Sequence, residues 1–204
     1  MAIRQHVGDL PDLSQYSGSV AIDTETMGLN PSRDRLCVIQ LSPGDGNADV
    51  VRLPKGHTNS PNLVRLFSDP DVTKIFHFAR FDMAVIKNRF GIDVTPAYCT
   101  KIASKLVRTY TDRHGLKDLA RELLGVDMSK QQQSSDWGAD ELSKAQLDYA
   151  ASDVLYLHDL KRHLDLMLMR EGRLELAQKC FDFLPTRVDL DLAGWAETDI
   201  FAHS

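Results

Sequence analysis

Cysteine is scarce in this sequence of 204 residues, which contains only Cys37, Cys99 and Cys180. The number is odd and the spacings are wide, so neither a disulfide framework nor a zinc site is indicated. No run of about 18 apolar residues occurs, and the N-terminal segment lacks the apolar stretch of a signal peptide. We therefore expect a cytoplasmic protein with no membrane segment.

The sequence also lacks an excess of basic residues, because 29 acids against 24 bases give a formal net charge of −5. Extended binding along a nucleic-acid backbone normally needs a basic surface, so this balance argues against it. One stretch departs from the average and is either a phosphate-facing patch or an ordinary solvated face. Its six bases and two acids are Lys101, Lys105, Arg108, Arg113, Lys117, Arg121, Asp112 and Asp118.

The first half of the chain has the pattern of a strand-rich α/β domain. Apolar runs separated by glycine, proline and asparagine predict an antiparallel meander of strands at 19–22, 36–41 and 49–53. The predicted elements that follow are a helix at 62–67, a strand at 74–78 and a helix at 81–89. This alternation predicts a mixed sheet with helices packed on it.

The second half is predicted to be helical. Apolar residues recur at helical spacing at 102–107 and 116–124, and the longest helix is predicted from Lys144 to Arg170. The polar segment 129–140 is too short to link separate domains, so we predict one domain over residues 1–204. The segment from about 181 to 204 combines acids with aromatic residues, and we expect a tail that makes subunit contacts.

Two acids interrupt the first long apolar run. Asp23 and Glu25 are two residues apart, a spacing that directs both side chains of a strand to one face, about 7 Å apart. Carboxylates at the end of a buried strand are costly unless they are paired, hydrogen-bonded or bound to a cation. The pair is either an exposed strand end or part of a metal site.

Three further residues belong with this pair. Asp82 stands where a predicted strand passes into a helix, and taken alone it is a favourable charge at a helix N-terminus. Tyr149 and Asp153 are four residues apart, so they share one face of the last long helix. Each has an ordinary explanation, but the five together form a recognisable pattern.

The five residues resemble the DEDDy branch of the DEDD 3′–5′ exonucleases. The first motif of that superfamily, D-x-E-T-x-G-L, matches residues 23–29 (DTETMGL), and its Y-x-x-x-D motif matches Tyr149 and Asp153. Residues 117–157, with Lys130 and the segment Ser135–Trp137, are similar to the RNase D group. The resemblance covers residues 18–165 and implies an RNase H-like α/β fold.

Features outside these motifs narrow the resemblance. The chain ends soon after Asp153, so we expect the helical HRDC-type RNA-binding domains of full-length RNase D to be absent. The chain closely resembles nano-RNase C, a group of short RNase D-like enzymes. The resemblance lies in its short length, in residues 109–116, in the Gln131–Gln133 run and in residues 194–204. This resemblance implies degradation of very short RNA to mononucleotides, a preference for diribonucleotides, and a ring-shaped homo-octamer.

The carboxylates suit a two-metal hydrolysis of phosphodiesters. Hard cations such as Mg²⁺ or Mn²⁺ prefer carboxylate oxygens, and two of them about 3.5–4 Å apart stabilise both the attacking and the leaving oxygen. By resemblance, the catalytic metal ligands are Asp23, Glu25, Asp82 and Asp153. Tyr149 is expected to orient the attacking water, because an ordinary tyrosine pKa near 10 makes it a poor free base.

Other residues are assigned to the substrate by resemblance or by proximity. Leu29 is expected to wedge against the terminal bases, and the backbone at Met27 and Gly28 to approach the terminal sugar, where glycine permits close contact. The other substrate-binding candidates, each of which could also be a core or solvated residue, are Thr24, His77, Phe78, Arg80, Arg113, His114 and Lys130. Trp137 either stacks on the substrate or packs internally.

Several alternatives remain open from the sequence. A phosphatase of the haloacid dehalogenase type also opens with an acid pair, but it needs Asp at position 25 and leaves Tyr149 and Asp153 unexplained. A non-catalytic nucleic-acid-binding scaffold should lack at least one metal ligand, and none is missing. Trimming of structured RNA 3′ ends and exonuclease action on DNA are both compatible with the motifs.

Overall fold

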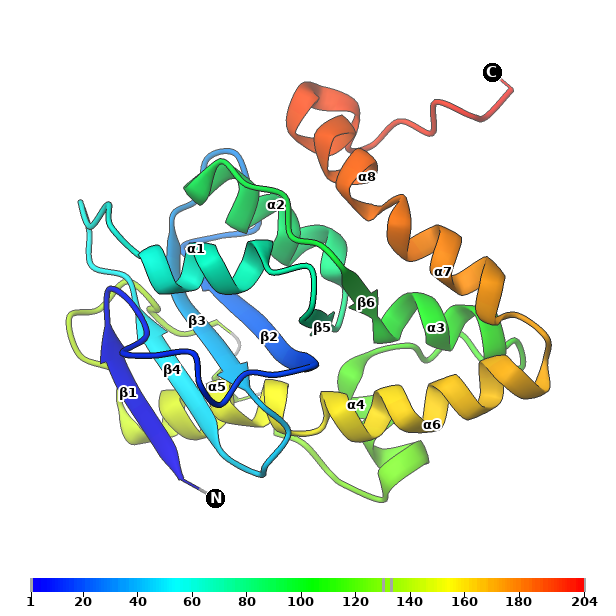
Figure 1. Cartoon of the computed structure of the whole chain (residues 1–204), viewed down its shortest axis with the longest axis horizontal. Helices are drawn as coiled ribbons and strands as arrows, with labels where there is room; N and C mark the ends of the chain where they lie inside the picture. Colours follow the sequence, from blue (N-terminus) through cyan, green and yellow to red (C-terminus); the bar gives the residue numbers. More distant parts are fainter. Residues whose placement is uncertain (1, 130, 133, 204) are drawn as a thin grey trace.

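The computed structural model describes residues 2–129, 131–132 and 134–203. Its strands form one mixed sheet in the order β1–β4–β3–β2–β5–β6 (Figure 1). They are β1 (Ile3–Val7), β2 (Ser19–Thr26), β3 (Leu36–Ser42), β4 (Ala48–Arg52), β5 (Thr73–Phe76) and β6 (Ala97–Cys99). β2, β3 and β4 are antiparallel neighbours, while β1–β4, β2–β5 and β5–β6 are parallel pairs. The predicted α/β class with an antiparallel meander is confirmed.

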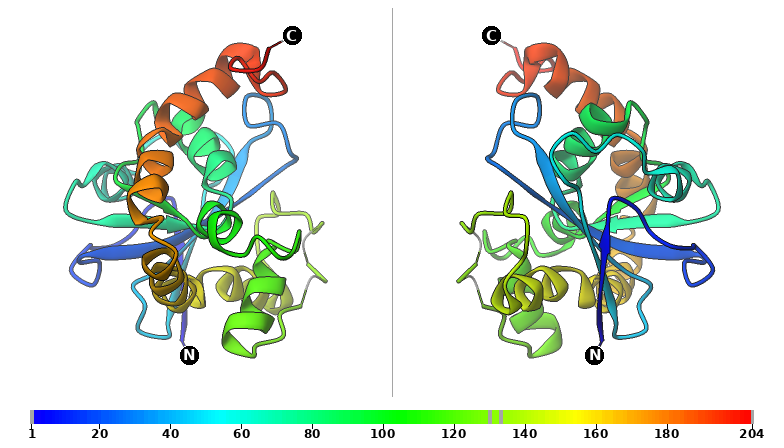
Figure 2. Two further views of the ribbon diagram at one scale, coloured as in Figure 1. Left: turned by 90° about the vertical axis from the view of Figure 1, so that its right-hand side faces the viewer. Right: turned by 90° about the vertical axis from the view of Figure 1, so that its left-hand side faces the viewer.

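Helices cover both faces of the sheet. They are α1 (Pro61–Ser68), α2 (Ala79–Phe90), α3 (Thr100–Val107), α4 (Leu116–Leu119), α5 (Lys144–Leu155), α6 (Leu157–Arg170), α7 (Leu174–Asp182) and α8 (Leu184–Leu190), with π-helical turns at Ala120–Leu124 and Asp191–Trp195. α1 and α2 lie on one face and α5 on the other (Figure 2). Across the described parts of the chain, none of the helices is long and apolar enough to cross a membrane.

β3 shows why the sheet is covered on both sides. All seven of its residues are buried, and alternate side chains point to opposite faces. Ile39 faces the main core, whereas Val38 packs with Val50, Trp137 and Ala150 beneath α5. This smaller cluster holds α5 against the sheet next to β2, the strand that carries Asp23 and Glu25.

The predicted single helix from Lys144 to Arg170 is wrong, because the segment forms two helices that meet at Tyr156. α5 packs on β2, β3 and β4, whereas α6 packs against α3 and β5. One straight helix cannot bury its apolar face against both surfaces. The chain therefore bends at Tyr156, where φ is −100° and ψ is −5°.

Two edge strands, β1 and β6, are missing from the sequence prediction. β6 spans only three residues, and β1 is held by polar contacts rather than by an apolar run. The buried carboxylate of Asp49 on β4 accepts hydrogen bonds from Arg4 Nε at 2.8 Å and lies 2.7 Å from His6 Nε2. It also accepts from the Tyr16 hydroxyl at 2.5 Å. β1 is thus fixed by partners about 45 residues away.

The first part of the segment from residue 181, which was expected to be a tail, is helical and packed. Leu184 and Val188 of α8 are buried, and α8 packs against α2. Asp191, in the turn after α8, accepts hydrogen bonds from Arg80 at 2.5 and 2.7 Å. Beyond Trp195 the chain is irregular and exposed up to residue 203.

Candidate active site

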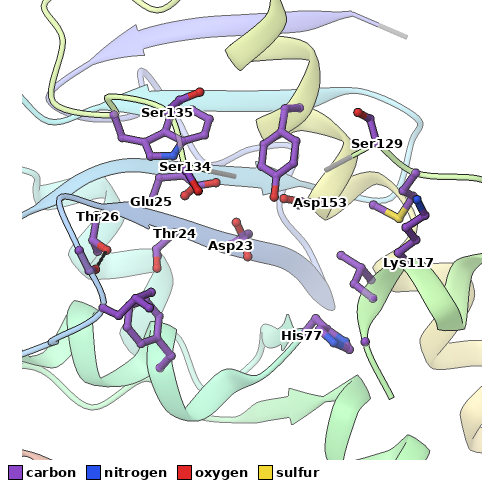
Figure 3. A pocket seen from close by; sticks show the side chains of 18 of the residues that line it. Asp23, Thr24, Glu25, Thr26, His77, Lys117, Ser129, Ser134, Ser135 and Asp153 are labelled. Carbon is purple, nitrogen blue, oxygen red and sulfur yellow. Dashed lines mark hydrogen bonds between the residues drawn. The ribbon is translucent and has the colours of Figure 1, made fainter. Parts of the chain in front are cut away.

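β2 presents two carboxylates on one side of the sheet. Asp23 and Glu25 alternate with the buried Thr24, so both point toward α5, into the cavity drawn in Figure 3. The pairing of β2 with β3 shifts register between Glu25 and Thr26. Such bulges re-aim side chains and are common beside active sites. The side chains of β2 are thus mainly apolar in its first half and acidic where the strand borders the cavity.

α5 supplies Tyr149 and Asp153 to the same cavity. The helix begins with a capping box, in which Ser143 Oγ accepts from the Gln146 backbone N–H at 3.2 Å and Gln146 Oε1 accepts from the Ser143 backbone N–H at 3.0 Å. These bonds fix the first turn of the helix. The buried Ala150 then sets which face of α5 meets the sheet, so Tyr149 and Asp153 are directed to the cavity one turn apart.

Asp82 comes from the first turn of α2, where the helix dipole favours a negative charge. Its side chain is buried, and Asp82 Oδ1 accepts a 2.7 Å hydrogen bond from the Thr24 hydroxyl. The Thr24 hydroxyl thus orients Asp82, and the predicted substrate contact by Thr24 stays a prediction. The bond ties Asp82 to the strand that carries Asp23.

Asp23, Glu25 and Asp153 form a tight cluster, in which one carboxylate oxygen of each residue lies within 4.8 Å of the others. Loss of hydration raises the pKa of Glu25 to about 9, and the charges of Asp153 and Asp82 add to the shift. Burial raises the pKa of Asp153 to about 7, against a hydrogen bond from Tyr149 that lowers it. Burial, followed by the charges of its three neighbours, raises the pKa of Asp23.

The four carboxylates fit a divalent cation site. Burial raises the pKa of Asp82 to about 7 as well, and four carboxyl groups so placed cannot all ionise near neutral pH without a compensating charge. Lys117 is the one lysine or arginine among the described residues that line the cavity, so the protein does not neutralise the cluster by itself. An all-oxygen donor set suits a hard cation such as Mg²⁺ or Mn²⁺.

The cavity beside the cluster has a volume of about 660 Å³, within the range of about 300–1,000 Å³ that is typical of small-ligand pockets. The predicted residues that line it are Asp23, Thr24, Glu25, Met27, Gly28, Leu29, His77, Tyr149 and Asp153. Leu29 is 88% exposed, so its side chain is free to touch a ligand. A Cβ at position 28 would meet the carboxylate of Asp34, so a larger residue there would displace the Asp34 side chain.

Two predicted substrate contacts, Phe78 and Arg80, line a neighbouring cavity of about 470 Å³ instead. Phe78 has a left-handed backbone (φ 69°) at the start of α2, which turns its ring outward, and Lys101 Nζ lies 4.4 Å from the ring centroid. The guanidinium of Arg80 forms a salt bridge with Asp191. Leu29 and Phe81 line both cavities, so the two spaces adjoin.

The predicted basic patch is only partly supported. Arg113 and His114 do not line the cavity, and His114 Nδ1 lies 2.8 Å from Ser104 Oγ. Arg108 is fully buried and pairs with Glu122. Lys117 is the basic residue of this stretch that lines the cavity. Lys130 lies outside the residues that the structure describes.

Several lining residues were missed by the sequence prediction. Phe81, Met128, Ser129 and Ser134 contribute to the cavity wall, beside Lys117 and Ser135, which the sequence named only within the basic stretch and the RNase D-like segment. Ser129 and Ser134 belong to a polar connection with no motif spacing, so only their proximity to Ser135–Trp137 pointed to them. Trp137 is buried, with its ring centroid 6.0 Å from that of Tyr149, which assigns it mainly to packing behind Tyr149.

Comparison with known proteins decides the family. Residues 8–169 match the 3′–5′ exonuclease family. The chain belongs to this family. Ribonuclease D of Acidiphilium cryptum is 36% identical over 156 residues, which cover 76% of this chain and 39% of that protein. The chain therefore spans less than half the length of the curated relatives it matches.

Solved structures agree with this assignment. Brucella melitensis NrnC bound to pGG is 63% identical with a TM-score of 0.97, and the match covers 100% of both chains. The same protein with bound Mg²⁺ is 62% identical with a TM-score of 0.96, again over both full chains. Escherichia coli RNase D is 28% identical with a TM-score of 0.76, over 84% of this chain and 45% of that one. The RNase H-like fold and the resemblance to nano-RNase C are confirmed, and the phosphatase alternative is not supported.

Proposed function

We propose that this exonuclease hydrolyses short RNA from the 3′ end, prefers diribonucleotides, and releases nucleoside 5′-monophosphates. The observation that carries the proposal is the meeting of Asp23, Glu25, Asp153 and Tyr149 in the wall of one cavity of limited size, with the buried Asp82 close enough for its charge to act on Asp23. The binding of pGG by the Brucella relative supports a substrate of two nucleotides. The acidic net charge also fits a short ligand better than a long one.

The proposed reaction is attack of water on phosphorus and breakage of the bond to the leaving 3′ oxygen. Two divalent cations, Mg²⁺ or Mn²⁺, would supply charge neutralisation and acidify the attacking water. Asp23, Glu25 and Asp153 would hold one of them, and Asp82 with Asp23 the other. Tyr149 would hold the water in line, because its hydroxyl reaches the same carboxylates.

The remaining roles concern substrate binding. Leu29 lies exposed at the rim, next to the Met27–Gly28 backbone, where it would wedge against a terminal base. Lys117 is the basic side chain that could pair with a phosphate within the described cavity wall. The other phosphate candidates, Arg113, His114 and Lys130, stay predictions, and a contact from any of them would need substrate to extend beyond this wall.

The function is tested by timed hydrolysis of 5′-labelled RNAs of two and about twenty nucleotides, beside single- and double-stranded DNA, with Mg²⁺ or Mn²⁺. We expect kcat/KM for the dinucleotide to exceed that for the long RNA by about tenfold or more. Faster cleavage of the long RNA would favour RNase D-like trimming, and faster cleavage of DNA a DNA exonuclease. Binding without hydrolysis would favour a scaffold.

We also propose that residues 1–204 form one exonuclease domain of a cytoplasmic homo-octamer. The C-terminal segment supports subunit contacts, because Trp195, Ile200 and Phe201 are 47%, 45% and 74% exposed. Such aromatic and apolar exposure is typical of interfaces. Light scattering should give a mass near eight times the 22.9 kDa chain. A monomer at micromolar concentration would contradict the octamer.

A further inference from the structure

His77 is the histidine of the main cavity wall, placed between β5 and α2 (Figure 3). Its ring is half-buried, and its Nδ1 lies 2.9 Å from Thr100 Oγ1 at the start of α3. The Thr100 side chain is fully buried and also contacts the backbone carbonyl of Phe76, at 3.1 Å. These contacts determine where the protons of the ring are.

A threonine hydroxyl has one proton to donate. A carbonyl can only accept, so the Thr100 proton is used by the contact with Phe76. The contact with His77 Nδ1 is then a hydrogen bond only if Nδ1 carries a proton and Thr100 Oγ1 accepts it. Burial and the nearby charge of Lys101 lower the pKa of His77 to about 3, so the ring is neutral. The other nitrogen, Nε2, therefore has a free lone pair.

A lone pair on Nε2 selects its partners. It repels phosphate and carboxylate oxygens, which are themselves acceptors, and attracts O–H or N–H donors. Within the described part of the chain, no hydrogen bond to Nε2 is found. Base donors differ among the four bases, whereas ribose hydroxyls are present in every ribonucleotide. A lone pair fixed in the cavity wall can therefore serve every ribonucleotide only by facing a ribose hydroxyl.

We propose that Thr100 holds His77 as its Nδ1–H tautomer, so that Nε2 accepts a hydrogen bond from a ribose hydroxyl of the bound RNA. The inference rests on the proposed function and specifies the substrate contact that was predicted for His77. His77 is a substrate-binding residue in this arrangement. Thr100 is a positioning residue, because it acts only through His77.

The test removes one hydroxyl at a time. kcat/KM is measured for a diribonucleotide and for three analogues, with 2′-deoxy at the first sugar, 2′-deoxy at the second, or 3′-deoxy at the second. In the wild type, one analogue should be about tenfold slower or worse, as for the loss of one hydrogen bond. In His77→Phe, that analogue and the full diribonucleotide should be cleaved equally well. If every analogue keeps its wild-type penalty in His77→Phe, the proposal is wrong.

Substitutions of Thr100 test the tautomer separately. Thr100→Val removes the acceptor of the Nδ1 proton. This variant should cleave the affected deoxy analogue as well as the full diribonucleotide, although His77 is still present. Thr100→Ser keeps the hydroxyl and should retain the penalty. Equal penalties in Thr100→Val and the wild type would overturn the role of Thr100. Because each result is a ratio of two substrates on one enzyme, a general loss of folding or metal binding cancels.

The same sugar changes are also placed at the 3′ end of an RNA of about twenty nucleotides. If the enzyme prefers the long RNA, the dinucleotide preference fails while the coupling to His77 is still measured. Conversely, if the dinucleotide is cleaved rapidly but the analogue penalty does not depend on His77, only the role of His77 is refuted and the proposed function stands. Thermal melting of each variant checks that it is folded under the assay conditions.

Discussion

Asp23→Asn abolishes hydrolysis of short RNA, with an expected loss in kcat/KM of about 10³-fold or more. Asp23 is the carboxylate whose pKa is raised by all three of the others, after burial, so it lies at the centre of the cluster. Asparagine has nearly the same shape but no charge, so the change removes the negative charge of a cation ligand without opening a cavity. The measurement is turnover of a diribonucleotide at saturating Mg²⁺.

The matched control is Asp148→Asn on the exposed side of α5. Asp148 pairs with Lys144 at 2.6 Å and does not line the main cavity, so this variant makes the same charge change away from the cluster. We expect its kcat/KM to stay within about twofold of the wild type, as for most surface substitutions. Substantial Mg²⁺-dependent turnover by Asp23→Asn would show that the cation site lies elsewhere.

Asp23→Asn should be more stable than the wild type when divalent cations are removed with EDTA. The folded-state pKa values of Glu25, Asp82 and Asp153 are raised to about 9, 7 and 7. Carboxyl groups whose pKa is raised by folding stabilise the folded state below the ordinary carboxyl pKa near 4. This stabilisation is lost as the pH rises through about 7 to 9. The metal-free wild type should therefore melt at a lower temperature at pH 8 than at pH 6.

Asp23→Asn removes one charge from this repulsion, so its loss of stability with pH should be smaller. A gain of ~1 kcal/mol corresponds to about 2–4 °C in a chain of this size. Mg²⁺ should raise the melting temperature of the wild type at pH 8 far more than that of Asp23→Asn. Equal shifts in both proteins would mean that Mg²⁺ binds without Asp23.

Four residues of the candidate site carry a local signal, whereas Asp82 was added to them only by the resemblance to the exonuclease motifs. Asp23 and Glu25 interrupt an apolar strand at a spacing of two, and Tyr149 and Asp153 recur at a helical spacing of four. Neither signal depends on the rest of the fold. The meander was predictable for the same reason, since β2, β3 and β4 are apolar runs bounded by turn residues.

The rest depends on contacts between distant segments. Arg80 looked free to bind substrate, but its partner Asp191 is 111 residues away, and nothing in the local sequence predicts that pair. The same holds for Arg108, which is hidden by its pairing with Glu122. A run of bases therefore predicted a surface patch from which folding removes individual charges.

The bend at Tyr156 illustrates a different limit. Apolar residues repeat at helical spacing across the whole segment from Lys144 to Arg170, so the pattern predicts one helix. The break is imposed by the two surfaces on which α5 and α6 pack. Periodicity shows that a segment is helical, but the direction of each half is set by tertiary packing.

Tyr149→Phe is expected to lower kcat by about 10²-fold, at the lower end of the range for groups that handle the proton of the nucleophile. Burial, followed by the charges of Asp153, Glu25 and Asp23, raises the pKa of Tyr149 above its ordinary value. The hydroxyl thus stays protonated throughout the working pH range and positions the water as a hydrogen-bonding group. Mg²⁺ affinity, measured by calorimetry, should change little, because the carboxylates are intact.

The pH–rate profile separates positioning from base catalysis. If Tyr149 only orients the water, Tyr149→Phe lowers the whole profile and leaves its shape unchanged, because no ionisation of tyrosine contributes to it. If Tyr149 were the base, the limb that reports its ionisation would disappear in the variant. Tyr156→Phe, at the bend that ends α5 and outside the main cavity, should match the wild type. A wild-type rate for Tyr149→Phe would remove Tyr149 from the mechanism, leaving the carboxylate cluster to orient the water.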